Sequence, residues 1–363
     1  MANTDVLITK QSEVMSFNNR LQLGRVIKFL GGGAFGKVYK MSAVGDMGSA
    51  VGNEMSAKGD MGSAVGDKGS MRVAVKVLPK LVPIGEEVTC NEYVAREIAI
   101  LAKLNGKPGV IELLSWCEGH FDIRLALRLF PHTMESFIHL QGNRKLWMKL
   151  PRVAKQLLDG LNHVHTAWVI HGDLKPANIL LDNSSAMGDL KLAIGDFGSA
   201  MDSDAAPGSP ASLSPKHLGH CNTTYQWRAP ELFVIKKLRT TSYSADIWAV
   251  GCVIVYFDTY QAPFGRSRMQ KNEVEKVFEL ALETLYGASH RSFDGKRENA
   301  KLFLEALEKL ELKKETDLPW AKQQPMAFRG TIRSFFVADY TKRPSASKLA
   351  ADKGLLEACK NSC

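Results

Sequence analysis

In the first third of the chain, apolar residues alternate with polar ones, as they do in β-strands. The alternation is clear over residues 26–30 and 38–40, and it returns over residues 71–78. Residues 110–116 and 123–130 are two further apolar segments of strand length. The pattern therefore predicts five strands within the first 130 residues.

A helical period replaces the strand pattern in one part of this region and in most of the chain beyond Pro131. Residues 92–104 place Val94 and Leu101 on one apolar helix face, and residues 150–167 carry a similar face. Three later helices are predicted, one buried and two amphipathic: residues 247–257, 274–285 and 302–310.

The change of pattern near Phe130 predicts an α+β protein with two lobes. Residues 21–130 would form an antiparallel β-sheet lobe with one main helix, and residues 131–350 a mainly α-helical lobe. Residues 1–20 would be an N-terminal extension and residues 351–363 a C-terminal tail. A chain of 363 residues is long enough to bury a substantial core.

Residues 41–68 are a tandem repeat of a 14-residue unit, and the two copies match at 11 positions. Two copies rich in Gly and Ser are too few for a solenoid. We predict a flexible insertion over residues 41–70, at the tip of a hairpin, where a long loop adds little closure entropy. Such an insertion is either a tolerated expansion or a regulatory docking segment.

Composition and charge disfavour several classes of protein. The net charge of +9 is spread along the chain, without the clusters of basic and aromatic residues that nucleic-acid binding uses. The six cysteines form no C-x-x-C pair, which favours free thiols in a reducing compartment. The N-terminus lacks the layout of a signal peptide, and no apolar run is long enough to span a bilayer. We therefore expect a cytoplasmic or nuclear protein with no nucleic-acid or membrane partner.

The most informative polar stretch is residues 171–178, which runs into the apolar residues 179–181. It contains Asp173, then Lys175 two residues later and Asn178 five residues later. Phosphoryl transfer uses these groups, because a carboxylate orients the attacking hydroxyl, a lysine neutralises phosphate charge and an amide holds a metal ion. A polar turn between a helix and a strand is the alternative interpretation.

A glycine-rich turn follows the first predicted strand. Its glycines have G-x-G-x-x-G spacing: Gly31, Gly33 and Gly36. Dinucleotide sites share this spacing but open a helix, whereas residues 37–39 continue as a strand. The turn is therefore predicted to cover nucleotide phosphates with its backbone N–H groups. Lys76 lies among apolar strand residues, and Glu97 on the predicted helix is its candidate acidic partner.

Later motifs complete an ordered set. Asp196, Phe197 and Gly198 end a strand pattern, and residues 229–231, 246–251 and 339–344 follow in turn. With this set, residues 21–349 resemble the eukaryotic protein kinase family, and the form of residues 173–178 is typical of its serine/threonine members. The resemblance implies a bilobal protein-kinase fold, ATP and Mg²⁺ as cofactors, and a protein substrate bearing Ser or Thr.

The resemblance also implies roles for the catalytic residues. Asp173 would accept or orient the proton of the substrate hydroxyl, and Lys175 would stabilise the transferred γ-phosphoryl group. Thr224 would bridge Asp173 and Lys175. Asn178 and Asp196 would coordinate Mg²⁺.

The nucleotide would be held by a further set of residues. Lys76, paired with Glu97, would bind the α- and β-phosphates. Leu127 would be the gatekeeper, and residues 128–130 would offer backbone hydrogen bonds to adenine. The resemblance gives these nucleotide-binding residues: Gly31, Gly32, Gly33, Gly36, Val38, Ala74, Lys76, Leu127, Arg128, Phe130 and Leu180.

Two structural groupings follow from the same resemblance. Glu231 and Arg343 would form a buried ion pair that ties the substrate loop to the helical lobe. Leu101, His171 and Phe197 would stack as part of a hydrophobic spine.

The chain departs from the family pattern at Gly172, where the family usually has an arginine that grips an activation-loop phosphate. Activity is therefore predicted not to depend strongly on such a phosphate. Residues 199–228 are rich in Ser, Pro and Gly. Ser209 and Ser214, each followed by Pro, are either targets of another kinase or part of an unregulated loop.

Residues 94–98 and 227–231 are similar to the cyclin-dependent and mitogen-activated kinase group. That similarity implies a preference for Ser or Thr followed by Pro and a cyclin-like regulatory subunit. A pseudokinase that serves as an ATP-binding scaffold is one alternative, but it would lack a catalytic Lys, Asp or Asn, and all are present. A small-molecule phosphotransferase is another, but such enzymes usually lack the motifs at residues 229–231 and 246–251.

Overall fold

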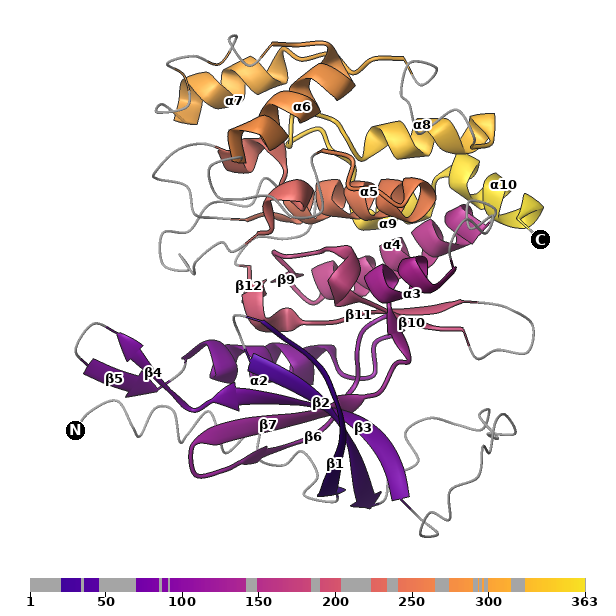
Figure 1. Ribbon diagram of the computed structural model, residues 1–363. Helices are drawn as coiled ribbons and strands as arrows, with labels where there is room; N and C mark the ends of the chain where they lie inside the picture. The colour runs from indigo at the N-terminus through magenta and orange to yellow at the C-terminus, as the bar shows by residue number, and fades with distance from the viewer. Residues whose placement is uncertain are drawn as a thin grey trace. The chain divides into compact units, whose positions relative to one another are not determined.

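The computed structural model describes the following residues: 21–33, 36–45, 70–84, 87–90, 92–141, 149–183, 190–203, 223–233, 241–264, 274–289, 293, 296, 300–314 and 324–362. The contacts within the chain divide it into two compact units (Figure 1). Unit 1 comprises Met1–Gly106, Ile111–Pro131 and Asn183–Asp189. Unit 2 comprises Lys107–Val110, His132–Asp182 and Leu190–Cys363.

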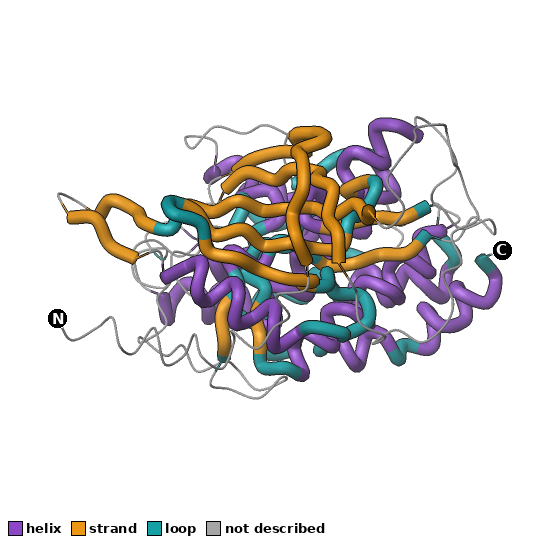
Figure 2. Tube along the Cα trace, turned by 90° about the horizontal axis from the view of Figure 1, so that it is seen from below, coloured by secondary structure: helices purple, strands orange, loops and turns teal. Residues whose placement is uncertain are grey.

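Unit 1 contains a five-stranded antiparallel sheet with the strand order β1-β2-β3-β7-β6. The strands lie side by side in Figure 2, where they are orange. Their bounds, in that order, are Leu21–Gly33, Gly36–Gly45, Ser70–Pro79, Asp122–Arg128 and Leu113–Glu118. The five predicted strands are all present in this sheet, but the described residues before Pro131 contain two more strands, so the predicted number is too low.

One face of this sheet carries an apolar core. Met41 lies opposite Val73 in the register of β2 and β3, and both are buried together with Ala43 and Val75. Alternate residues of a strand share a face, so these side chains point to the same side. The prediction of a flexible insertion over residues 41–70 is therefore wrong at its ends, because β2 extends to Gly45 and β3 starts at Ser70. The rest of the insertion lies outside the described residues.

Helix α2 (Glu92–Leu104) has the bounds that the apolar spacing predicts, and it buries its apolar face. A second hairpin in unit 1, formed by β4 (Leu81–Ile84) and β5 (Glu87–Cys90), was not predicted. Each of its strands has only four residues. Pro83 also lacks a backbone donor, so the segment has no clear strand pattern.

Unit 2 is mainly helical. Its helices α3 to α10, as labelled in Figure 1, are Met134–Gln141, Leu150–Thr166, Tyr243–Thr259, Val274–Tyr286, Ala300–Glu308, Met326–Ser334, Ala346–Ala350 and Lys353–Asn361. Helix α5 is buried on almost all sides, as its apolar run predicts. Ser242 caps its N-terminus by accepting a hydrogen bond from the Ala245 N–H at 3.1 Å.

Short strand pairs in unit 2 hold the segment that contains Asp173. Strand β9 (Val169–Ile170) precedes the segment and pairs with β12 (Met201–Asp202). Strand β10 (Ile179–Asp182) follows it and pairs with β11 (Lys191–Ile194). Residues 171–178 therefore form a loop that is fixed by a strand at each end.

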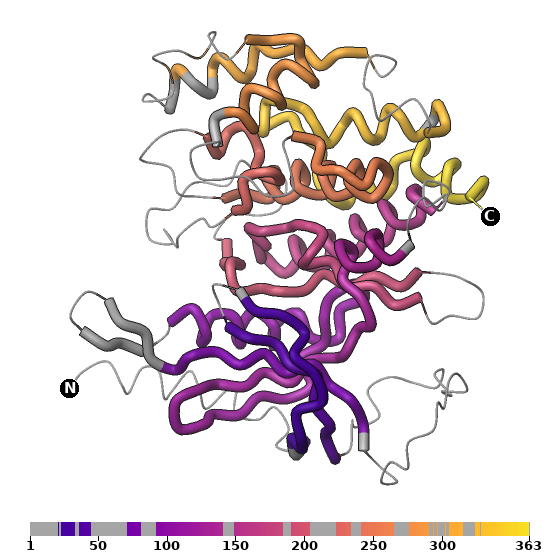
Figure 3. Tube along the Cα trace, viewed as in Figure 1, coloured from indigo at the N-terminus to yellow at the C-terminus, as the bar shows by residue number. Residues whose placement is uncertain are grey.

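The end of the chain, predicted as a tail, contains helix α10 and packs against α8 (Figure 3). Asp352 caps this helix, since its Oδ1 accepts from the Leu355 N–H at 3.0 Å, and the Thr331 hydroxyl donates to the same oxygen at 2.5 Å. The last described residues therefore belong to the helical unit. Among the described helices, none combines the length and the apolar character needed to cross a bilayer.

Candidate active site

The loop at residues 171–178 is held by a carboxylate from a distant helix. Asp246 of α5 accepts a hydrogen bond from the His171 N–H at 2.8 Å and another from the Gly172 N–H at 2.9 Å. The Nε2 atom of His165 lies 3.0 Å from the same carboxylate. Asp246 is 2% exposed, so these donors replace the water that a buried carboxylate would otherwise require. The start of the loop is thereby fixed to α5.

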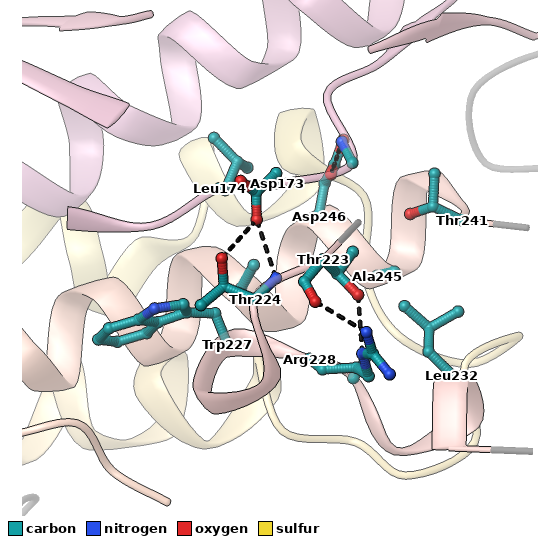
Figure 4. Close-up of a pocket in the computed structure, with 13 residues that line it drawn as sticks. Asp173, Leu174, Thr223, Thr224, Trp227, Arg228, Leu232, Thr241, Ala245 and Asp246 are labelled. Atoms are coloured by element: carbon teal, nitrogen blue, oxygen red, sulfur yellow. Dashed lines mark hydrogen bonds between the residues drawn. The ribbon is translucent and has the colours of Figure 1, made fainter. Parts of the chain in front are cut away.

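The Asp173 carboxylate is oriented by two neighbours, as Figure 4 shows in part. Its Oδ1 accepts from both the backbone N–H and the hydroxyl of Thr224, each at 2.9 Å. Its Oδ2 accepts from the Lys175 ammonium at 2.5 Å, which also donates to the Thr224 hydroxyl at 3.2 Å. The expected bridge from Thr224 to Asp173 and Lys175 is therefore present.

Asn178 and Asp196 are brought near each other by backbone contacts. The Asn178 side-chain amide donates to the Asp173 carbonyl at 2.8 Å, which leaves its Oδ1 atom as an acceptor. The N–H of Gly195, the neighbour of Asp196, donates to the Asn178 carbonyl at 2.9 Å. An amide oxygen and a carboxylate are ligands that Mg²⁺ prefers, so these residues fit that ion.

Mg²⁺ would need further ligands at this position. Within the described part of the chain, no group of three or more His, Cys, Asp or Glu side chains could hold a metal ion. Mg²⁺ commonly combines one or two protein oxygens with waters and substrate phosphates. The oxygens of Asn178 and Asp196 match that kind of site.

His171 links the start of the loop to the segment around Asp196. Its Nε2 lies 3.0 Å from the Gly195 carbonyl, and its Nδ1 accepts from the Asp173 N–H at 3.3 Å. Its ring centroid lies 4.9 Å from that of Phe197. The expected contact of His171 with Phe197 is therefore observed, whereas Leu101 belongs to unit 1 and its stacking with them stays a prediction.

In unit 1, Lys76 of β3 and Glu97 of α2 form a buried ion pair, with 2.6 Å between Nζ and Oε1. The two residues are 6% and 3% exposed. A buried ammonium needs such a partner, because removal from water penalises an unpaired charge. The predicted pairing is present.

Residues predicted to bind the nucleotide share one face of the sheet in unit 1. Val38 lies opposite Lys76 in the register of β2 and β3, and Ala74 lies opposite Leu127 in that of β3 and β7. Cross-strand partners share a face, and so do residues two apart on one strand, so these four residues lie on one side. Leu180, another of the predicted nucleotide-binding residues, belongs to unit 2.

The glycine turn has the predicted hairpin form. Gly31 pairs with Val38, and Gly33 pairs with Gly36. Gly36 has φ of +143°, and a Cβ placed there would lie 2.4 Å from the Val77 carbonyl oxygen. The position therefore requires glycine, which brings the tip of β2 close to β3.

The backbone N–H of Arg128, one of the predicted hydrogen-bond donors to adenine, already donates to another residue. Its backbone N–H donates to the Glu112 carbonyl at 3.0 Å, and its guanidinium binds the Glu112 carboxylate. Of the three residues expected to offer backbone hydrogen bonds to adenine, Arg128 therefore cannot use its N–H without giving up this bond. Leu129 and Phe130 lie beyond the end of β7.

The buried ion pair between Glu231 and Arg343 is present as expected. The guanidinium donates to both carboxylate oxygens, at 2.9 and 3.1 Å, and also to the carbonyls of Ser244 and Val337. Planar, bidentate contacts of this kind fix the relative orientation of both side chains. Residues 229–231 are thereby fixed to α5 and to the segment before α9.

Sequence reasoning missed the roles of Asp246 and Arg228. Arg228 donates to the Thr223 hydroxyl and to the Thr223 carbonyl, both at 2.8 Å, and so holds the residue before Thr224 (Figure 4). A signal for Asp246 was present, because it is a charged residue at the start of the most apolar helix. A buried acid there needs several donors. Nothing in the sequence indicates which donors those are.

Comparison with known proteins decides the family. Residues 56–353, most of the chain, match the family model for the protein kinase domain. The chain belongs to the protein kinase family. The predicted fold is therefore confirmed, with an antiparallel sheet in one unit and mainly helices in the other. The glycine turn lies before the matched residues.

Several curated kinases are similar to this chain. Cyclin-dependent kinase C-2 C of Arabidopsis thaliana is 33% identical over 193 residues, which cover 52% of this chain and 27% of that protein. Serine/threonine-protein kinase PKH3 of Saccharomyces cerevisiae is 30% identical over 229 residues, which cover 60% of this chain and 24% of that protein. The chain spans about a quarter of the length of these relatives. Because their names come from more than one kinase group, the similarity to cyclin-dependent kinases is weak.

Proposed function

We propose that this protein kinase transfers the γ-phosphoryl group of Mg-ATP to a Ser or Thr hydroxyl of a protein substrate. The Asp173 carboxylate is the observation that supports this most. Two hydrogen bonds from Thr224 occupy Oδ1, and one from Lys175 reaches Oδ2. A carboxylate oxygen accepts about two hydrogen bonds, so Oδ2 can accept one more from a substrate hydroxyl.

In this proposal Asp173 takes the proton of the substrate hydroxyl, and Lys175 stabilises the phosphoryl group that is transferred. The substrate oxygen forms a bond to the γ-phosphorus, its proton moves to Asp173, and the bond from phosphorus to the β-phosphate oxygen breaks. Lys175 donates to Oδ2 of Asp173, so its positive charge lies where the attacking oxygen would approach. A fixed charge at that place stabilises the transferred phosphoryl group.

The proposal also assigns groups that would hold ATP and Mg²⁺. Asn178 and Asp196 would supply oxygens to Mg²⁺, which neutralises phosphate charge when bound. Lys76, fixed by Glu97, would bind the α- and β-phosphates. The nucleotide contacts from the glycine turn, Val38, Ala74, Leu127, Phe130 and Leu180 stay predictions.

The decisive experiment measures transfer of labelled phosphate from ATP to a generic basic protein. Asp173→Asn keeps the shape of the side chain but cannot take the proton, so the rate should fall by roughly 10²- to 10⁴-fold. Asp159→Asn is a matched control, because Asp159 forms an i,i+4 pair with Lys155 on the surface of α4. It should leave the rate unchanged.

Each alternative predicts a different result in this assay. Transfer that survives Asp173→Asn would refute the role of Asp173. Binding of ATP without transfer to any substrate would indicate a pseudokinase scaffold. Transfer to small hydroxylated molecules but not to proteins would indicate a small-molecule phosphotransferase.

Substrate preference, partner and location also belong to the proposal. Similarity to cyclin-dependent kinases supports a preference for Ser or Thr followed by Pro and a cyclin-like regulatory subunit. A peptide library that compares Pro with Ala after the acceptor tests the preference directly. A cytoplasmic or nuclear location is proposed from the cysteine content. Imaging of the tagged chain in cells tests it.

A further inference from the structure

A small cavity lies beside the loop that contains Asp173 (Figure 4). About 10 Å³ of it is open to the centre of a water molecule. One water needs roughly 10–15 Å³ of such space, so the cavity has room for a single water and no room for a larger ligand. Its lining includes Gly172 from the loop together with Thr241 and Asp246.

Thr241 brings a hydroxyl without a partner to this cavity. The residue is 4% exposed and directly precedes Ser242, which caps α5. Within the described residues, no group hydrogen-bonds to its Oγ1 atom. Figure 4 shows this hydroxyl pointing toward the other residues that line the cavity. A buried hydroxyl without a hydrogen bond is costly, so the position favours a ligand that supplies one.

The Asp246 carboxylate can accept one more hydrogen bond on one of its two oxygens. Its Oδ2 accepts from the His171 N–H and lies 3.0 Å from Nε2 of His165. Its Oδ1, in the part of the chain that the structure describes, accepts only from the Gly172 N–H. A carboxylate oxygen accepts about two hydrogen bonds. Asp246 is 2% exposed, so a second donor to Oδ1 would replace hydration that the carboxylate lost on folding.

We propose that the cavity binds one water molecule, which accepts a hydrogen bond from the Thr241 hydroxyl and donates one to Oδ1 of Asp246. Two such partners lie within the range that buried waters use. The bridge joins Thr241 to the carboxylate that holds the N–H groups of His171 and Gly172. Thr241 is therefore a positioning residue for the loop, and any effect on phosphoryl transfer rests on the proposed kinase function.

X-ray crystallography at a resolution that orders waters is the direct test. Electron density for a water is expected within about 2.7–3.2 Å of both the Thr241 hydroxyl oxygen and Oδ1 of Asp246. Clear density for both side chains with no water between them would overturn the site. A direct hydrogen bond between the two side chains would overturn it as well.

Thr241→Val tests the same contact in solution, because valine has the shape of threonine and no hydroxyl. If a water bridges Thr241 and Asp246, loss of the hydroxyl should lower the melting temperature by about 2–4 °C. If the hydroxyl has no partner, its removal should raise the melting temperature instead, because a buried unsatisfied group is lost. An unchanged or raised melting temperature would therefore overturn the proposal.

Thr166→Val is a matched control for this substitution. Thr166 is exposed, and its hydroxyl donates to the Asn162 carbonyl of its own helix α4 at 2.8 Å. The melting temperature of this variant should change little. The comparison separates the loss of the bridge from the general effect of replacing threonine by valine.

Hydrogen exchange tests the link from Thr241 to the loop and needs no kinase activity. Thr241→Val should speed exchange of the Gly172 amide by about three- to tenfold, as for the loss of one hydrogen bond. Amides of α10, which report overall stability, should change less. Thr241→Ser keeps the hydroxyl and should keep exchange at Gly172 slow.

Two results would overturn the positioning role of Thr241. One is equal acceleration at Gly172 and in α10, and the other is equally fast exchange at Gly172 in the valine and serine variants. Because melting and exchange are measured without ATP, failure of the proposed kinase function would not affect either result.

Discussion

One buried charged group in unit 1 and one in unit 2 are stabilised in different ways. In unit 1, Lys76 and Glu97 neutralise each other across 2.6 Å. In unit 2, Asp246 accepts from two backbone N–H groups and lies beside the His165 ring. The first arrangement joins one strand to one helix, whereas the second joins a helix to the backbone of a loop.

The difference determines how each arrangement should fail. If one member of a buried ion pair is removed, the other stays buried and charged, so the whole benefit is lost at once. A change at a carboxylate with several donors, such as Asp246, can remove one hydrogen bond and leave the others. The loop at residues 171–178 would then no longer be held in place by all of its contacts. Loss of one member of the Lys76–Glu97 pair should therefore cost more stability than loss of the Asp246 carboxylate, which should also disturb the loop that contains Asp173.

The largest effect is expected from Lys76→Met, which leaves Glu97 buried without its ammonium partner. The free energy of unfolding should fall by about 3–5 kcal/mol. Urea denaturation measures it. The double variant Lys76→Met/Glu97→Leu removes both charges and should regain much of the loss. If the single variant were as stable as the double variant, the unpaired charge of Glu97 would not be the cause of the lost stability.

A smaller effect is expected from Asp246→Asn. An amide oxygen can still accept from one N–H, but its NH₂ group would face another donor, so about 2–4 kcal/mol of stability should be lost. Phosphoryl transfer should fall as well, because the loop before Asp173 loses its anchor. Urea denaturation and the transfer assay measure the two effects, with Asp159→Asn as the surface control. If the variant were less stable but transferred phosphate at the full rate, Asp246 would have no role in catalysis.

Thr224→Val removes the hydroxyl that bridges Asp173 and Lys175 but keeps the backbone N–H on Oδ1. The rate of transfer should fall about tenfold, equivalent to about 1.4 kcal/mol, while stability changes little. Thr224→Ser keeps the hydroxyl and should keep most of the rate. A valine variant as fast as the serine variant would show that the bridge does not position Asp173.

Asp258 in unit 2 is a partly buried carboxylate with a neutral partner, the Gln324 amide at 2.8 Å. Burial raises its pKa from 3.8 to about 6, and the hydrogen bond from Gln324 opposes this shift. The folded state therefore binds more protons than the unfolded state between these values, so stability should fall as pH rises from 3.8 to about 6.

Asp258→Asn should remove this part of the pH dependence. After allowance for solvent screening, it should stabilise the protein by about 1 kcal/mol at pH 7. Thermal unfolding of both proteins at several pH values between 4 and 7 measures the difference. Equal pH profiles would contradict the raised pKa of Asp258.

The smallest effect is expected from phosphatase treatment. Gly172 has no side chain to bind a phosphate. Thr223 and Thr224 are held by hydrogen bonds with Arg228 and Asp173, and these contacts involve no phosphate group. The rate of transfer should therefore change little after treatment, as the transfer assay can measure. A large loss that rephosphorylation restores would contradict this. Ser209 and Ser214, predicted to be either targets of another kinase or part of an unregulated loop, lie outside the described residues.

The sequence alone predicted the parts of this protein that depend on local order. The bounds of α2 match the predicted helix, and the five strands of the sheet in unit 1 fall on the predicted segments, because side-chain period follows directly from backbone conformation. Asp173, Lys175 and Asn178 lie within one loop, so their spacing can be recognised from the amino-acid sequence alone.

Only the tertiary structure decided which distant groups meet. Asp246 follows His171 by 75 residues, and its contact with that backbone depends on how α5 packs beneath the loop. The same holds for the contact of His165 with Asp246, and for the helix α10 that was predicted as a tail. A sequence records that a buried acid needs donors, but the choice of donor is a property of packing, which places residues far apart in the chain within 3 Å of each other.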